Sequence, residues 1–264
     1  MSDQFEVEQA QQLGGNGNIG AREERHPYNN REPIPDGTSV LIVGTAPPPR
    51  FSLPRLAGQT LSQDDVDFFY GSKENCLWRE FLDEIAKEIE GESLFSKTGE
   101  ACVVAMRNFL RRHKMWMRDV LETYQRKKES ALDNDICKPV PSDLTDFAKL
   151  FDEHAKLSVV FFTSEQAAKW TVLKLEDQCL MPKGTFAEAV CRKAMPTDAP
   201  LDDYIAVKFK APLYDGEVAV RRGVYKRKVA FFILPTPARR SAKKGLVVAR
   251  KKEIYREMLF DGSP

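Results

Sequence analysis

Three short, continuously apolar segments constrain the fold of this 264-residue chain more than any other feature. They cover residues 39–43, 157–162 and 229–234, where branched and aromatic side chains dominate. Such runs are typical of strands that are buried on both faces, as the strands of a parallel sheet are. Stretches with helical periodicity lie between them. The alternation predicts an α/β fold with a three-layer α/β/α arrangement around a short, mostly parallel central sheet.

Four segments show the spacing of apolar side chains that an amphipathic helix needs, namely residues 76–89, 101–112, 164–175 and 242–259. In open parallel sheets, ligands bind beyond the carboxyl ends of the strands. We therefore expect the loops that follow Val43, Phe162 and Leu234 to converge on one site.

The chain is expected to form one domain with a flexible extension. Residues 1–37 are rich in Gln, Gly, Asn and Pro, which predicts a flexible N-terminal arm. Residues 38–264 then form the α/β domain. Pro and Gly interrupt residues 176–228, which we interpret as an irregular insertion with short strands at 204–210 and 217–221.

The distribution of charge is uneven although the net charge is only +1. Residues 221–252 contain twelve Lys or Arg and no acidic residue, and residues 107–128 contain eight basic and two acidic residues. Two basic segments can form one cationic face that favours a polyanion such as DNA. The alternative is a solvated surface without a ligand.

Cysteine and histidine offer no metal-binding spacing. The five Cys residues are far apart, no C-x-x-C occurs, and the three His residues are scattered. We expect reduced thiols, no metal and no cofactor. The polar N-terminus and the lack of a long apolar run predict a cytoplasmic protein without a membrane segment.

Four segments carry a resemblance to a known family. Residues 40–47, Val-Leu-Ile-Val-Gly-Thr-Ala-Pro, are similar to an active-site loop in which a strand ends in Gly-x-x-Pro. Residues 69–78, Phe-Tyr-Gly-Ser-Lys-Glu-Asn-Cys-Leu-Trp, resemble Tyr-Tyr-(Gly/Ala)-His-Pro-Arg-Asn-x-Phe-Trp. Residues 117–136 contain parts of Trp-Asp-Val…Ser-Leu-Asp-x-x-Ile, and residues 234–240 resemble a second active-site loop, Leu-Pro-Ser-x-Ser-Pro-Ala. In this order, the segments resemble the uracil-DNA glycosylase superfamily, and most closely its hypoxanthine/uracil branch of deoxyinosine and G:T/U mismatch-specific enzymes.

The resemblance implies that Asn75 is the catalytic residue, because it matches the Asn of that branch. The preceding His-Pro-Arg is replaced by Ser-Lys-Glu at residues 72–74, and the first loop carries Thr45 and Ala46 where other branches have acidic or amide side chains. An amide is no base at neutral pH, so Asn75 would orient water or donate a hydrogen bond. The alternative role of Asn75 is a helix cap.

The resemblance also implies two contact surfaces. The residues expected to bind a flipped base are Gly44, Thr45, Ala46, Pro47, Phe51, Tyr70 and Asp119, with Tyr70 as the preferred stacking partner. The residues expected to press on DNA and hold its phosphates are Pro235, Thr236, Pro237, Ala238, Arg239, Arg240, Lys243 and Lys244. Alternatively, Asp119 and Asp133 brace loops, and the basic turn is solvated.

The sequence therefore predicts a monofunctional DNA glycosylase that flips out a base, hydrolyses its N-glycosidic bond and leaves an abasic site. Its substrate is expected to be uracil, hypoxanthine or a bulky modified cytosine of phage DNA, for example glucosylated hydroxymethylcytosine, with a role in repair or antiviral defence. We expect a monomer. The alternatives are a catalytically inactive DNA-binding module of the same fold and, less well supported without a Gly-rich phosphate loop, a nucleotide-binding protein.

Overall fold

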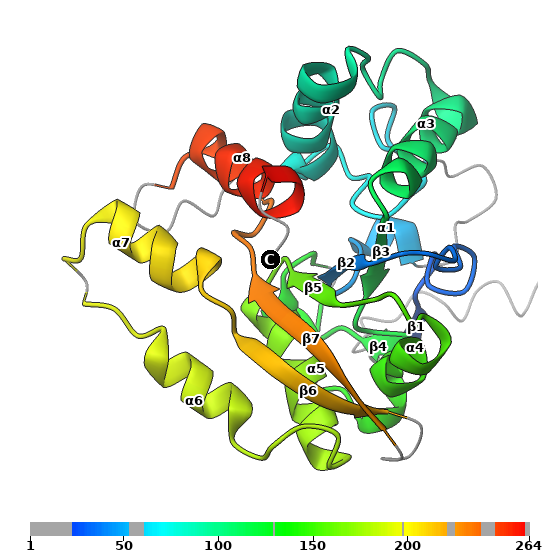
Figure 1. The fold of residues 1–264 in the computed structure, drawn as a ribbon. Helices are drawn as coiled ribbons and strands as arrows, with labels where there is room; N and C mark the ends of the chain where they lie inside the picture. Colours follow the sequence, from blue (N-terminus) through cyan, green and yellow to red (C-terminus); the bar gives the residue numbers. More distant parts are fainter. Residues whose placement is uncertain are drawn as a thin grey trace, which may run out of the picture.

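The computed structural model describes residues 23–52, 61–128, 130–196, 198–220, 225–238 and 246–261. It is a mixed α/β protein built on a mostly parallel five-stranded sheet (Figure 1). In spatial order the strands are β3 (Met115–Asp119), β2 (Val40–Gly44), β5 (Val159–Phe162), β7 (Tyr225–Ile233) and β6 (Tyr214–Val220). Only β6, at one edge, is antiparallel to its neighbour.

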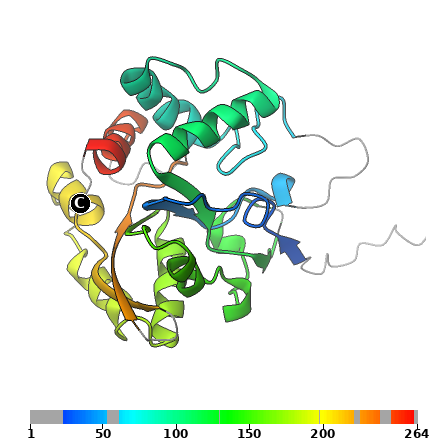
Figure 2. The same ribbon diagram turned by 45° about the vertical axis from the view of Figure 1, so that its right-hand side comes forward.

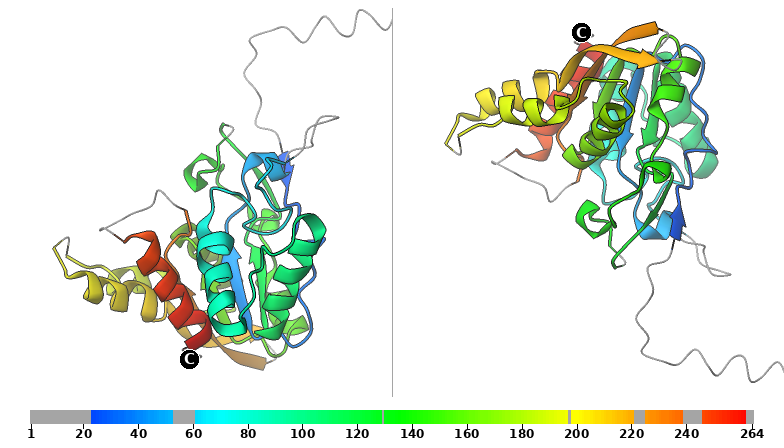
Figure 3. Two further views of the ribbon diagram at one scale, coloured as in Figure 1. Left: turned by 90° about the horizontal axis from the view of Figure 1, so that it is seen from above. Right: turned by 90° about the horizontal axis from the view of Figure 1, so that it is seen from below.

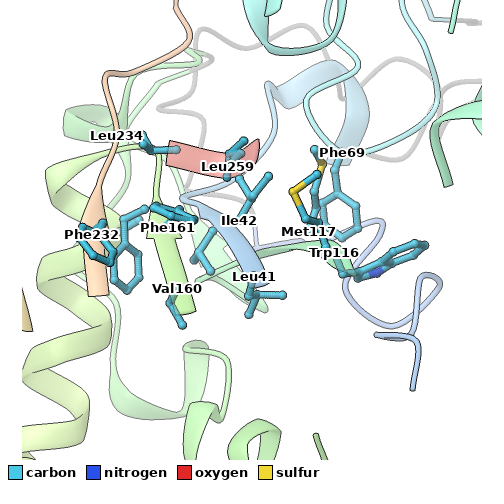
Figure 4. Close-up of a cluster of buried hydrophobic side chains, with 14 of the residues drawn as sticks. Leu41, Ile42, Phe69, Trp116, Met117, Val160, Phe161, Phe232, Leu234 and Leu259 are labelled. Atoms are coloured by element: carbon cyan, nitrogen blue, oxygen red, sulfur yellow. The ribbon is translucent and has the colours of Figure 1, made fainter. Parts of the chain in front are cut away.

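The central strands are buried, as the three apolar runs predict. Leu41 and Val160 are fully inaccessible, and Phe161 is 1% exposed. All three belong to one hydrophobic cluster, which also includes side chains of the neighbouring strands and Leu259 (Figure 4). The apolar runs do not predict β3, because its sequence, Met-Trp-Met-Arg-Asp, contains no continuous apolar run of comparable length.

Helices flank the sheet on opposite sides, with α3 (Gly99–Arg112) against β3 and α5 (Glu165–Asp177) against β5 (Figure 2). The helix α5 begins where the sequence predicts, because Ser164 Oγ accepts a hydrogen bond from the backbone N–H of Ala167 at 3.1 Å. The other helical elements are α1 (Pro49–Ser52), η1 (Leu77–Leu82), α2 (Asp83–Glu90), η2 (Asp133–Asp135), η3 (Pro141–Asp143), α4 (Phe147–Glu153), α8 (Val248–Arg256) and η7 (Glu257–Asp261).

The predicted insertion is more regular than its composition indicates. It contains α6 (Thr185–Arg192), α7 (Leu201–Ile205), η4 (Ala206–Lys210) and β6. The expected strand at 204–210 is wrong, because Ile205 and Phe209 lie four residues apart and are buried together on a helical face. The expected strand at 217–221 falls within β6 up to Val220. Figure 3 shows α6 and α7 on the side of the molecule opposite to β1 (Glu23–Arg25).

The predicted arm boundary at residue 37 is also wrong for the described part of that segment. β1 pairs with β4 (Thr123–Gln125), and Tyr28 is 1% exposed. Asn29, also 1% exposed, donates from Nδ2 to the carbonyl oxygens of Asp119 and Leu121 and accepts from the Asp119 N–H. The polar composition of this segment is typical of a loop. Its buried polar side chains, however, bond to the end of β3 rather than to solvent.

We predict that Asn29→Ala destabilises the protein by about 3 kcal/mol, because it leaves buried backbone groups without partners. Urea denaturation provides the measurement. Asn30→Ala is the control, since Asn30 is exposed, and it should leave the free energy of unfolding nearly unchanged. Equal stability of the two variants would contradict the structural role of Asn29.

Candidate active site

A cavity of about 670 Å³ lies beyond the carboxyl ends of the parallel strands. Its walls come from the segments that follow β2, β5, β7 and β3, together with the segment that precedes η1. In residue numbers these are 45–48, 163–164, 236–238, Asp119 with 131–133, and Phe68 with 70–75. The expected convergence of loops at one edge of the sheet is therefore confirmed.

The cavity lies where the connections of neighbouring strands diverge. β2 leads towards α2 and α3, whereas the adjacent β5 leads into α5 on the opposite side of the sheet (Figure 2). Such a switch point leaves a crevice between two strand ends, and it is the usual place for a ligand in an open α/β sheet. Here Thr45 Oγ1 and Ser164 Oγ lie 2.9 Å apart across it.

A chain of hydroxyl groups leads from the start of α5 to a carboxylate in the cavity. Thr45 Oγ1 donates to Asp133 Oδ2 at 2.9 Å and forms a second hydrogen bond of 2.9 Å with Ser164 Oγ. Ser164 accepts in turn from the Ala167 N–H. Removal of its hydration raises the pKa of the Asp133 carboxyl above its ordinary value, and the nearby charge of Asp119 adds to this effect.

Gly44 allows two polar groups to approach the first loop closely. A Cβ at this position would lie 2.3 Å from Tyr70 Oη and 2.5 Å from Asp119 Oδ1, so only glycine fits. The Tyr70 hydroxyl bonds to Thr163 Oγ1 at 3.1 Å, and the Tyr70 backbone is left-handed with a φ of 56°. Burial raises the pKa of the Tyr70 phenol well above its ordinary value, so it remains a hydrogen-bond donor.

Asp119 is held by a histidine from the N-terminal segment. His26 Nδ1 accepts from the backbone N–H groups of Tyr28 and Asn29 at 3.2 and 3.0 Å. The ring proton therefore sits on Nε2, which donates to Asp119 Oδ2 at 2.8 Å. The other oxygen, Oδ1, is also buried, and no group within the described ranges donates to it.

Asn75 lies at the cavity and beside the second predicted loop. It forms an isolated antiparallel bridge with Ala238, and the next N–H, of Cys76, donates to the Pro237 carbonyl at 2.9 Å. Its side-chain Oδ1 accepts from the Leu77 N–H at 2.9 Å at the start of η1. Asn75 thus lines the cavity, while its side-chain oxygen is engaged by a backbone N–H of the first turn of η1.

The loop after β7 is braced from α8. Lys251 Nζ donates to the carbonyl oxygens of Thr236 and Ala238 at 3.1 and 3.0 Å, and Tyr255 Oη donates to that of Pro235 at 2.9 Å. Burial lowers the pKa of Lys251. Neither residue had been assigned to the site from sequence.

The structure divides the predicted contact residues into accessible and inaccessible groups. Thr45, Ala46, Pro47, Phe51, Tyr70 and Asp119 line the cavity together with Thr236, Pro237 and Ala238. Within the described part of that loop, residues 235–238, Pro235 and Pro237 are buried, whereas Thr236 is half-buried and Ala238 is exposed. Arg239, Arg240, Lys243 and Lys244 lie outside the described residues. Sequence reasoning also missed Leu132, a cavity-lining residue that is 64% exposed.

Much of the basic surplus is matched within the protein. In residues 225–252, every described Lys and Arg has a partner: Lys226 with Glu217, Lys228 with Asp215, Arg250 with Asp202 and Glu253, Lys252 with Glu88, Arg227 with carbonyl groups that include Leu157, and Lys251 with the loop after β7. A basic run in the sequence therefore overstates the charge that these residues offer to a polyanion.

Among the described residues, no group of three or more His, Cys, Asp or Glu side chains is arranged to hold a metal ion. Within the same ranges, no helix combines the length and the apolar character needed to cross a membrane.

No family model and no curated protein matches the chain. A solved structure that resembles it is the solution NMR structure of a candidate uracil DNA glycosylase from Methanosarcina acetivorans. The two chains share 21% sequence identity, with a TM-score of 0.35, over 53% of this chain and 71% of the other. A similarity this distant carries no argument about the reaction.

We predict that Asp133→Asn stabilises the protein at pH 8 and that the gain shrinks towards pH 4. A raised carboxyl pKa in the folded state means that stability is lost as the pH rises through that pKa, and the neutral amide avoids the loss. Urea denaturation across this pH range measures it. The exposed Asp64→Asn serves as the control; a gain that does not depend on pH would contradict the explanation.

Proposed function

We propose that this protein is a monofunctional DNA glycosylase of the uracil-DNA glycosylase type, with its helices and sheet in a three-layer arrangement. One observation carries the proposal: Asn75 and both loops singled out from the sequence line a single cavity, although they are far apart in the chain. We further propose that the protein acts on DNA as a cytoplasmic monomer and needs no cofactor.

Base flipping gives the cavity a specific task. Extruding a base from the duplex costs a few kcal/mol, which the cavity must offset. Stacking on an aromatic ring contributes about 1–3 kcal/mol per base, and the rings of Tyr70 and Phe51 lie in the cavity wall. Thr45 offers a polar group to the edge of the base. Leu132 and Ala238 are exposed apolar side chains on the DNA-facing rim.

The size of the cavity bears on the substrate. Its volume of about 670 Å³ lies well inside the range of ~300–1,000 Å³ typical of sites for drug-sized ligands. A bare uracil or hypoxanthine would leave part of it unfilled. A bulky modified base, such as glucosylated hydroxymethylcytosine, would fill more of it, and an enzyme with that substrate would act in defence against phage.

The described residues of the cavity wall offer no group suited to a lyase step. A lysine that forms a Schiff base needs a pKa depressed by burial or by neighbouring cations. Lys73 lines the cavity mouth but is exposed. We therefore expect an intact abasic strand as the product.

A DNA-binding module without catalysis is the second candidate. Two observations favour it: Asn75 Oδ1 is engaged as a helix cap, and Ala46 has no polar group with which to orient water. Such a module would bind DNA in a salt-dependent manner and release no base.

We predict that the protein releases a free base from DNA and leaves a site that alkali cleaves. The measurement is mass spectrometry of released bases from duplexes with uracil, hypoxanthine or glucosylated hydroxymethylcytosine, with unmodified duplex as the control. The substituted cytosine should be the best substrate. Binding to every duplex without release of any base would select the inactive module instead.

We predict that Asn75→Asp and Asn75→Ala both slow base release by about 10²–10³-fold, the usual loss for a missing catalytic hydrogen-bond donor. Asp keeps an acceptor for the Leu77 N–H, so only the Ala variant should also lose about 1 kcal/mol of stability. Single-turnover rates and urea denaturation measure the two effects. If the Asp variant keeps the parent rate, Asn75 is a cap and nothing more.

A further inference from the structure

The Asp119 carboxylate is the least satisfied charged group in the described part of the cavity. It ends β3 and is 6% exposed, yet it borders the cavity. His26 bonds to Oδ2, whereas Oδ1 is buried and receives no hydrogen bond within the described ranges. A buried carboxylate oxygen without a donor is costly, and such exceptions in folded proteins often mark functional sites.

We propose that Asp119 is the catalytic base that activates water for glycosidic hydrolysis, and that His26 is the residue that positions it. The proposal rests on the glycosylase function given above and names the group that performs its proton transfer. It assigns to Asp119 a catalytic role rather than the contact with the base edge expected from the sequence.

The other polar groups of the cavity are less suited to this role. The Asn75 amide cannot accept a proton at neutral pH. Asp133 is engaged by the Thr45 hydroxyl through Oδ2, and Glu74 lies exposed at the mouth. Among the described residues of the cavity wall, only Asp119 combines burial, a carboxylate oxygen that receives no hydrogen bond and a fixed N–H donor to its second oxygen.

Two features orient the carboxylate. The His26 ring is fixed by the N–H groups of Tyr28 and Asn29 and by stacking on Phe69, with ring centroids 5.6 Å apart and planes 27° apart. On the other side, Asp119 Oδ1 faces the Cα of Gly44, where any Cβ would collide with it. The Tyr70 hydroxyl lies at the same place, 2.3 Å from the position that a Gly44 Cβ would take, so Gly44 lets both polar groups approach the first loop.

The step proceeds with water as the only co-reactant. A water molecule that donates to Asp119 Oδ1 attacks C1′ of the flipped deoxynucleoside. The bond between C1′ and the base nitrogen breaks, and its electron pair leaves with the base. The water gives a proton to the Asp119 carboxylate, and the base nitrogen takes up a proton from solvent. The products are the free base and an abasic sugar with a hydroxyl group at C1′.

The test compares single-turnover base release with DNA affinity in the full-length protein. Asp119→Asn should slow release by about 10²–10⁴-fold, the range for loss of a general base, while the Kd for a duplex with an uncleavable analogue stays unchanged. Asp119→Ala should regain activity when formate is added, because the small carboxylate can occupy the vacated space. No purely structural role predicts that rescue.

His26 is tested with a matched pair of variants. His26→Phe keeps an aromatic ring against Phe69 but removes the N–H donor, so release should slow with little change in Kd. His26→Gln supplies an amide donor to Asp119 and should recover part of the rate. Thermal unfolding of each variant establishes that the fold is retained.

The outcomes separate the two proposals. If the parent releases no base from any duplex, the proposed function fails and this assignment fails with it. If the parent is active and Asp119→Asn is equally fast, only the assignment of Asp119 is overturned. Slow release that formate does not rescue, together with weakened DNA binding, also overturns it, because Asp119 would then act through binding.

Discussion

The parallel pairing of β2 with both of its neighbours is the constraint on which the site depends. Its register sets Gly44 opposite Asp119 on one side and Val43 opposite Phe162 on the other. The three strands therefore end at the same level. The first polar residues beyond them lie next to one another because of the strand register alone. Because all three strands are buried, their ends are the first places where the chain can present polar groups to a ligand.

The elements that could be predicted are those whose signal is local. Continuous apolar runs identified β2, β5 and β7, and Asn75 lies beside the loop after β7. The rest depends on tertiary contacts. His26 looked like part of a polar arm because its partner is 93 residues away, and residues 204–210 fit both an alternating and a helical pattern. The sequence offered Asp133 as a residue that braces a loop, but its bond to Thr45 at the switch point depends on tertiary structure.

Charge shows the same dependence on tertiary structure. Lys251 belongs to the most basic stretch of the sequence, yet it is 2% exposed and holds the carbonyl groups of the loop after β7. With Tyr255 it fixes one wall of the cavity from behind, while the N–H of Cys76 fixes the same loop from the opposite side. A wall bonded on both sides is preorganised, so little ordering is needed when a ligand enters.

The short ribbon formed by β1 and β4 lies outside the main sheet, yet it leads directly into the histidine that contacts Asp119. During synthesis His26 emerges well before β3. Its bond to Asp119 can therefore form only after β3 has been made and has paired with β2. Shortened versions of the protein that start at residue 38 would keep the sequences of all five strands but would lack His26, which bonds to the Asp119 carboxylate. For domain trimming, fusion or display, the functional unit therefore begins no later than Glu23.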